Sequence, residues 1–102
     1  MASRRGLSLS SPSHPAVHWA ALEGHVAIIQ ELCEHRVPID LRDASRSTAL
    51  IIAAEKGHTE AVLHLLAYNA DVNLKRGDGW TALHLACFNG REKIAHELIS
   101  RK

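Results

Sequence analysis

Residues 78–90 read Asp-Gly-Trp-Thr-Ala-Leu-His-Leu-Ala-Cys-Phe-Asn-Gly, and part of this stretch has occurred before in the chain. The Thr-Ala-Leu of residues 81–83 also stands at residues 48–50, and an equal step further back reaches Pro-Ala-Val at residues 15–17. Four positions hold the same residue in all three copies: Ala16/Ala49/Ala82, Ala20/Ala53/Ala86, Gly24/Gly57/Gly90 and Leu32/Leu65/Leu98. A fixed period of about 33 residues indicates a stacked array, in which each unit buries its apolar face only against its neighbours.

The three copies resemble the ankyrin repeat at several offsets in register. Residues 78–90 are similar to the pattern D-G-x-T-P-L-H-x-A-A-x-x-G, with Ala82 where proline is usual. Residues 48–73 match the later part of the pattern, with Asn69 in place of the usual glycine. The first copy departs most at its start, where Pro15 takes the threonine position. The resemblance covers roughly residues 14–102 and implies three repeats, the last one truncated.

The residues also predict the architecture on physical grounds. Thr48 and Thr81 precede apolar periodic segments, where a hydroxyl can cap the free N–H groups of a helix. Gly57 follows the first of these segments, where glycine permits the left-handed turn that ends a helix. We therefore expect an all-α solenoid of helix–turn–helix units joined by hairpin-like loops. The repeats fall at about residues 14–46, 47–79 and 80–102.

Residues 1–13 are rich in serine and arginine and have little to bury, which predicts a flexible N-terminal tail. Two functional alternatives stay open for this tail: a transit peptide, or phosphoacceptor sites at Ser8 and Ser11. The formal net charge of +1 gives no reason to expect a nucleic-acid or membrane partner. No apolar run approaches the ~20 residues that span a bilayer.

The two cysteines, Cys33 and Cys87, align with apolar positions of the other copies, and we expect both to face the core. Two buried thiols suit a reducing compartment and predict a cytoplasmic or nuclear protein. Four of the eight histidines hold ankyrin positions and are structural by resemblance: His18, His25, His58 and His84. His14 and His18 lack a third ligand near them in sequence, so we expect neither a metal site nor a cofactor.

No catalytic motif stands out. The chain has no G-x-S-x-G segment, and its glycines are spaced by the repeat rather than gathered into a phosphate-binding loop. Ankyrin arrays, by contrast, bind through a groove formed by the loop tips and the exposed side of each first helix. The resemblance therefore implies a protein-binding site with these candidates: Trp80, Phe88, Asp78, Asn89, Glu55, Lys56, Ser45 and Ser47.

Trp80 and Phe88 are the central candidates, because exposed aromatic side chains rimmed by polar residues mark interfaces. In the alternative interpretation, Trp80 folds over its own loop and Phe88 packs against a neighbouring helix.

The hairpin before the second repeat also departs from the family pattern. Arg46 replaces a usual glycine there, which predicts a tighter or reshaped hairpin.

The third copy ends before its return loop, with no polar capping repeat after it. Ile94, Leu98 and Ile99 are therefore expected to lie on a terminal helix with one side uncovered. This predicts self-association through the uncapped C-terminal repeat, or fraying of the last helix.

These observations predict a non-enzymatic module that binds another protein through the concave groove of an ankyrin-repeat array. Two alternatives remain. The chain is a regulatory or targeting segment of a larger ankyrin-containing enzyme, channel or signalling protein, or it is a short isoform that competes with its parent. The identity of the partner does not follow from the fold, because a groove carries no universal code.

Overall fold

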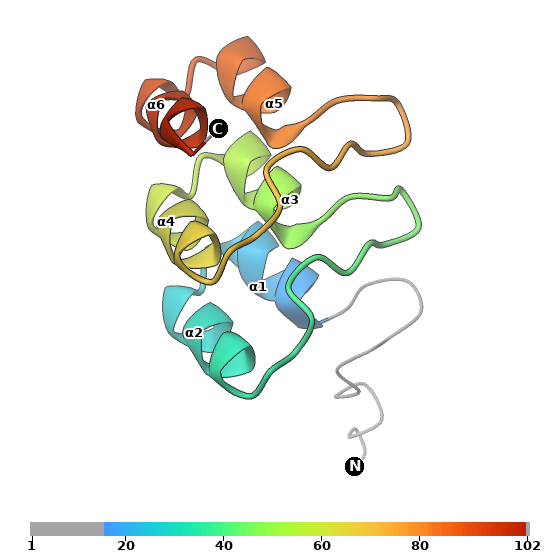
Figure 1. The fold of residues 1–102 in the computed structure, drawn as a ribbon, viewed down its shortest axis with the longest axis vertical. Helices are drawn as coiled ribbons and strands as arrows, with labels where there is room; N and C mark the ends of the chain where they lie inside the picture. Colours follow the sequence, from blue (N-terminus) through green and yellow to red (C-terminus); the bar gives the residue numbers. More distant parts are fainter. Residues whose placement is uncertain (1–15, 102) are drawn as a thin grey trace.

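The computed structural model describes residues 16–101, and within this range the chain forms helices joined by turns and loops, with no strand (Figure 1). The helices are α1 (Ala16–Glu23), α2 (Val26–Glu34), α3 (Ala49–Lys56), α4 (Thr59–Ala67), α5 (Ala82–Phe88) and α6 (Glu92–Ser100). The expected all-α, helix–turn–helix fold is confirmed. The predicted tail at residues 1–13 and the histidine His14 lie outside the described residues.

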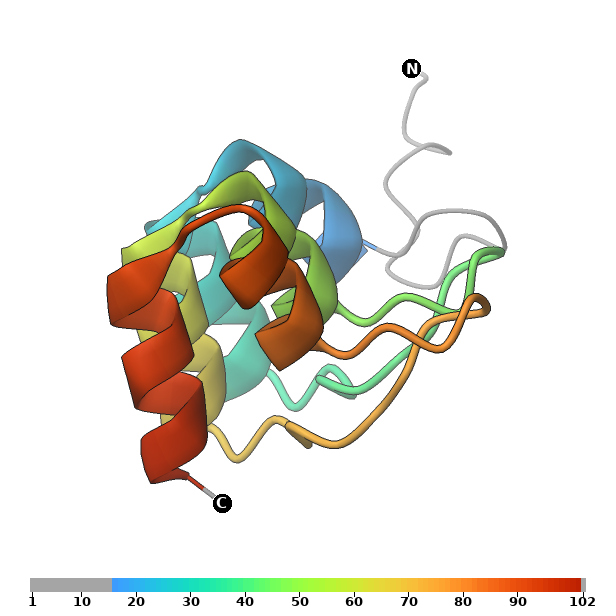
Figure 2. The same ribbon diagram turned by 90° about the horizontal axis from the view of Figure 1, so that it is seen from above.

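The helices stack in two rows, with α1, α3 and α5 in an inner row and α2, α4 and α6 in an outer row (Figures 1 and 2). Each helix packs on its equivalent in the next repeat: α1 on α3, α3 on α5, α2 on α4 and α4 on α6. The loops that lead into α3 and α5 project beyond the inner row as two hairpins (Figure 1). The hairpins and the exposed side of the inner row together form one surface, which we call the inner face.

The core is a ribbon between the two rows, and small side chains make it thin. Ala53 and Ala54 on α3 are fully buried, as is Ala86 on α5, so neighbouring inner helices approach each other closely. The outer row supplies the larger apolar groups, among them Val62 and Leu65 on α4, both also fully buried. Each repeat therefore depends on its neighbours for most of its buried apolar area.

The predicted helix ends are present. Thr48 Oγ1 accepts a hydrogen bond from the Ile51 N–H at 3.3 Å, and Thr81 Oγ1 accepts one from the His84 N–H at 3.2 Å. The Nδ1 atom of His84 in turn accepts from the Thr81 N–H at 3.2 Å, which completes a reciprocal cap. Gly57 ends α3 with φ +79°, the left-handed conformation expected of it.

The expectation that Arg46 makes its hairpin tighter or reshaped is wrong. Arg46 has φ +67°, in the same left-handed region as Gly79 at the equivalent position of the next hairpin, where φ is +90°. The Arg46 N–H donates to the Asp43 carbonyl at 2.8 Å, and the Gly79 N–H donates to the Arg76 carbonyl at the same distance. The backbone therefore keeps one shape, and Arg46 adopts a conformation that L-residues disfavour.

Side chains after each helical turn tie one repeat to the repeat before it. His58 Nε2 lies 3.0 Å from the Leu22 carbonyl oxygen and donates to it, since a carbonyl can only accept. Arg91 occupies the equivalent position in the third repeat, and its Nη2 donates to the Glu55 carbonyl at 3.3 Å. Each of these turns therefore contains both a glycine and a residue whose side chain hydrogen-bonds to the preceding repeat.

A buried histidine makes a further link between the first two repeats. His18 Nε2 donates to the Ser47 carbonyl at 2.6 Å, and the side chain is almost fully buried. Its Nδ1 has no hydrogen-bond partner within residues 16–101. Ile51 replaces this histidine in the second repeat and is itself buried, so apolar packing stands there instead of the hydrogen bond.

The expectation that both cysteines face the core is correct for Cys33, which is half-buried and packs against the core, and wrong for Cys87, which is exposed. Cys87 aligns with Ala21 and Ala54, which are fully buried. The following repeat covers those two alanines, whereas no described repeat follows Cys87.

All three apolar residues expected on the last helix lie on α6, and one side of that helix is uncovered, as expected. Ile94 and Leu98 are each 1% exposed and belong to the core. Ile99 is 59% exposed. The uncovered part of α6 is therefore the side that carries Ile99.

Candidate protein-binding face

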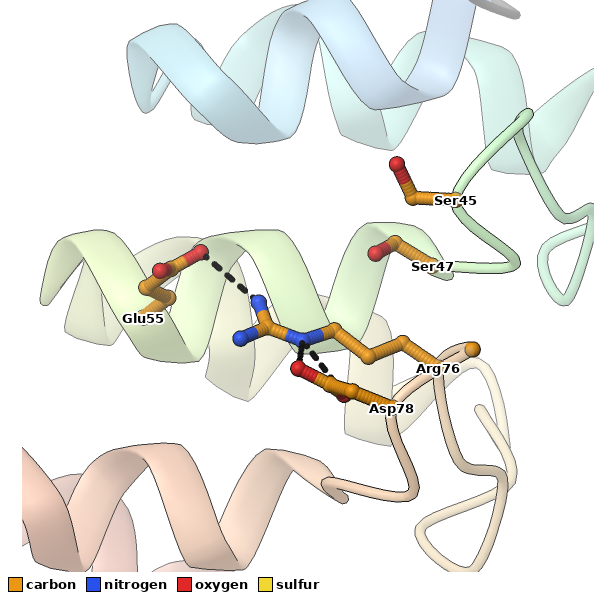
Figure 3. Close-up of a pocket in the computed structure, with 6 residues that line it drawn as sticks. Ser45, Ser47, Glu55, Arg76 and Asp78 are labelled. Atoms are coloured by element: carbon orange, nitrogen blue, oxygen red, sulfur yellow. Dashed lines mark hydrogen bonds and ion pairs between the residues drawn. The ribbon is translucent and has the colours of Figure 1, made fainter.

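A polar hollow of about 470 Å³ opens on the inner face between the two hairpins and α3 (Figure 3). Both hairpins and the C-terminal half of α3 contribute to it, so it exists only when two repeats are stacked. Its lining residues are Ser45, Ser47, Glu55, Arg76, Gly77 and Asp78.

Arg76 lies in the middle of the polar hollow and holds two carboxylates. Its Nε donates to Asp78 Oδ1 at 3.0 Å and to Oδ2 at 3.1 Å, and its Nη1 lies 3.4 Å from Glu55 Oε1 (Figure 3). The hydrogen bond from Arg76 is the main cause that holds the pKa of Asp78 below its usual range. With two carboxylates to one guanidinium, the cluster carries a net negative charge.

The backbone of the first hairpin is shaped by a carboxylate of its own. Asp43 Oδ1 accepts from the Ser45 N–H at 2.8 Å and from the Ser47 N–H at 3.0 Å. The Ser45 carbonyl then accepts from the Gly77 N–H at 2.8 Å, which joins the two hairpins. Ser45 and Ser47 both line the hollow from the first hairpin (Figure 3).

The second hairpin uses a different residue for the same task. Arg76 stands where the first hairpin has Asp43, so the carboxylate that shapes the turn has moved two residues along the chain to Asp78. Asp78 Oδ1 accepts from the Trp80 N–H at 3.2 Å. Because residue 76 does not have to shape the turn, its side chain is able to extend across the inner face to Glu55.

A smaller, more apolar hollow of about 190 Å³ lies beside the polar one, between α1 and α3. Leu22 and Ile52 supply aliphatic walls, and Trp19, which is 52% exposed, supplies an aromatic one. Glu55 lines both hollows, so they adjoin along the inner face. The remaining lining residues are His18, Asp43 and Lys56.

Trp80 and Phe88 are in contact but differ in exposure. Their ring centroids are 5.3 Å apart in an edge-to-face arrangement. Phe88 is 75% exposed, as expected. Trp80 is half-buried: it packs against the core, and the guanidinium carbon of Arg76 lies 6.0 Å from its ring centroid. Phe88 holds the repeat position of Leu22 and Glu55, so it continues their row along the inner helices.

The structure brings five of the eight predicted site residues to the two hollows: Ser45, Ser47, Glu55, Asp78 and Lys56. Asn89 ends α5, and its Nδ2 donates to the Leu85 carbonyl at 3.0 Å, so part of its hydrogen-bonding capacity serves the helix end. Sequence reasoning did not name Trp19, Asp43, Ile52 or Arg76 as candidates. The signal for Arg76 was available, since it breaks the correspondence between repeats at the position of Asp43.

Within residues 16–101, no group of three or more histidine, cysteine or acidic side chains is arranged to hold a metal ion. His35 and His96 are exposed and His64 is half-buried on the outer row, as their repeat positions predict. None of the helices in this part of the chain has the length and apolar character needed to cross a membrane.

Comparisons with known proteins agree with this geometry. A family model described as "Ankyrin repeats (3 copies)" matches residues 17–102. The chain is also similar to Ankyrin repeat domain-containing protein 29 of Danio rerio, with 43% identity over 51 residues. That match covers 49% of this chain but only 17% of the length of the relative. Ankyrin repeats are a general protein–protein interaction module. A match over nearly the whole chain, on a stack of paired helices with two projecting hairpins, shows that this chain belongs to the ankyrin-repeat family.

Proposed function

We propose that this chain is a non-enzymatic module that binds a segment of a partner protein across its inner face. The observation that carries the proposal is the pair of adjoining hollows that share Glu55. One hollow is polar and the other largely apolar, so a bound segment meets two different chemistries within a short distance. Phe88, exposed and held edge-on by Trp80, extends the same surface over the third repeat.

The chemistry of the hollows indicates what kind of segment fits. Glu55 and Asp78 share one guanidinium, so the polar hollow favours a lysine or arginine side chain over an acidic one. The apolar hollow, with Leu22 and Ile52 as walls, suits an aliphatic side chain. A partner segment with an aliphatic residue near a basic one satisfies both hollows.

The proposal is tested by affinity capture with variants that change the inner face but keep the fold. Ser45→Trp fills the polar hollow from an exposed loop position without removing the Arg76 ion pairs. Ala67→Trp, at an exposed position on the outer row, is the matched control. We expect the wild type and Ala67→Trp to capture the same protein and Ser45→Trp to lose it.

The captured protein is then purified and titrated by calorimetry against Phe88→Ala. Truncation of a central aromatic anchor costs about 2 kcal/mol or more, so we expect a Kd weaker by roughly 25-fold or more, with an unchanged Tm. Equal affinity for the wild type, Ser45→Trp and Phe88→Ala would exclude the inner face as the binding site.

A second candidate is that the module acts as a regulatory or targeting segment within a longer polypeptide. The match to a short part of a longer relative favours it. Immunoblotting of the native protein tests it: a polypeptide much larger than 11.2 kDa supports this candidate, and a band at that mass contradicts it.

A further inference from the structure

Ser45 differs from the other serines that the structure describes. It is exposed near the tip of the first hairpin, and its hydroxyl makes no hydrogen bond within residues 16–101. Ser47, by contrast, is 5% exposed, and the Ser100 hydroxyl donates to the His96 carbonyl at 2.9 Å. Ser45 is therefore the described serine that another enzyme can reach without unpacking the core or breaking a hydrogen bond of the hydroxyl.

The charges beside Ser45 in the sequence favour phosphorylation. Arg42 stands three residues before it and Arg46 directly after it. Neither arginine forms an ion pair within the described residues, so no acidic side chain there competes for them. Protein kinases select substrates by the pattern of charge around the acceptor. An arginine three residues before the acceptor suits a kinase with an acidic substrate cleft.

The turn that contains Ser45 is able to open. Asp43 Oδ1 accepts from the Ser45 N–H at 2.8 Å in an exposed position, where water can replace this bond. Arg46 has φ +67°, a conformation that L-residues disfavour. Both features lower the cost of drawing this segment into the extended form that enters a kinase cleft.

Arg76 faces the same hollow as Ser45 and is suited to hold a phosphate there. Both residues line the polar hollow, and the two hairpins meet where the Gly77 N–H donates to the Ser45 carbonyl at 2.8 Å (Figure 3). A phosphoserine carries about −1.5 to −2 charges at pH 7, and a guanidinium can pair with two of its oxygens. Glu55 and Asp78 each offer Arg76 a single negative charge, so the phosphate competes well for it.

We propose that Ser45 is a phosphorylation site for a kinase that recognises basic residues, and that Arg76 holds the resulting phosphate in the polar hollow. In the transfer, the Ser45 hydroxyl oxygen bonds to the γ-phosphorus of ATP and the bond from that phosphorus to ADP breaks. The hydroxyl proton passes to a base of the kinase. The phosphate adds a second link between the hairpins and makes the hollow more negative. This site does not depend on the proposed function, because it can be tested without the partner protein.

Phosphorylation of the folded full chain tests the acceptor, with Mg²⁺, ATP and a purified kinase that selects arginine three residues before its serine. Ser8 also follows an arginine by three residues, so every chain in the assay carries Ser8→Ala. Tandem mass spectrometry should find phosphate at Ser45 and none at Ser47, and Arg42→Met should lower the initial rate. Ser100→Ala removes an exposed serine that lacks this arginine and should leave the rate unchanged. An unmodified Ser45, or equal rates for the wild type and Arg42→Met, would overturn the proposal.

Titration of the phosphorylated chain by ³¹P NMR tests the contact with Arg76. The reference is a phosphorylated peptide with the sequence of residues 40–50, which keeps the arginines beside Ser45 but lacks Arg76. We expect the second pKa of the phosphate to be lower in the folded chain than in the peptide, because the guanidinium stabilises the dianion. Arg76→Met should raise this pKa to the value of the peptide, whereas Lys75→Met should not.

A second measurement needs no substitution at Arg76. In the phosphorylated wild type, the pKa of Asp78 should rise above its value in the unmodified chain, because the phosphate draws the guanidinium away and adds negative charge nearby. Equal phosphate pKa values in folded chain and peptide, or an unchanged pKa of Asp78, would overturn the contact. Circular dichroism of each variant confirms that the fold is kept.

Discussion

The backbone of Arg46 is strained, although the hydrogen bonds around it look ordinary. The hydrogen bonds of its hairpin match those of the hairpin at Gly79, so the contacts alone give no sign of a cost. The cost lies in the backbone, because φ +67° brings the Cβ of an L-residue too close to the following carbonyl. Arg46 is exposed, and neither ion pairs nor hydrogen bonds of its side chain are seen within the described residues to offset this.

We therefore expect Arg46→Gly to stabilise the protein. Relief of the left-handed strain gains about 1–2 kcal/mol, and the greater freedom of glycine in the unfolded chain returns about 0.4–1 kcal/mol of it. The net gain is about 1 kcal/mol, measured by urea unfolding. Arg42→Gly, at a nearby position without positive φ, is the control and should not stabilise. A midpoint for Arg46→Gly at or below that of the wild type would contradict the assignment of strain.

Gly57 is the opposite case, where the backbone conformation favours glycine. Its φ of +79° disfavours any side chain, and a Cβ at this position would lie 2.7 Å from the guanidinium carbon of Arg91, so that flexible side chain would have to move. Gly57→Val should cost about 1–3 kcal/mol in the free energy of unfolding. Gly57→Asn should cost less, because asparagine tolerates the left-handed region. Equal melting temperatures for the wild type and Gly57→Val would contradict the conclusion that α3 ends at a left-handed residue 57.

At the scale of the element, the second hairpin is stabilised by the ion pair between Arg76 and Asp78 as well as by its backbone hydrogen bonds. The guanidinium of Arg76 lowers the pKa of Asp78, so the ionised carboxylate is stabilised more in the folded state than in the unfolded chain. This contribution to stability is complete above the ordinary pKa of an aspartate. It is lost as the pH falls through the lowered pKa of Asp78.

Arg76→Met should therefore raise the pKa of Asp78 toward its ordinary value, measured by NMR titration of the side-chain carboxyl carbon. The difference in Tm between the wild type and Arg76→Met should shrink as the solution is made acidic. Lys75→Met removes a neighbouring exposed charge and should leave the titration of Asp78 nearly unchanged. An unchanged titration in Arg76→Met would mean that the ion pair does not form in solution.

Features that recur between repeats were predictable from the sequence, because local chemistry decides them. The threonine caps, the left-handed glycine and the buried alanines each follow from residue type and register. The link from Arg76 to Glu55 was not predictable in this way. It joins a hairpin to a helix of the preceding repeat and depends on how two repeats stack.

At the scale of the whole molecule, the burial of a side chain depends on the position of its repeat in the stack, which residue type alone does not predict. Cys87 and Ala54 hold equivalent positions, yet Cys87 is exposed and Ala54 is fully buried. Within residues 16–101, the third repeat packs over Ala54, whereas no further repeat packs over Cys87. Trp80 was expected to face outward, but Arg76 and Phe88 hold its ring against the core and leave it half-buried. Which residues bind a partner remains a prediction for all eight candidates.

The central claim is that the inner face, and not the outer row, contacts the partner. Site-specific photo-cross-linking tests it directly, with a photoreactive phenylalanine analogue placed at Phe88 on the inner face or at Lys93 on α6. Both positions are exposed, so the folded chain tolerates the probe at either one. The account predicts that irradiation with the captured partner gives a cross-linked product from position 88 and none from position 93. A product from position 93 alone would contradict it.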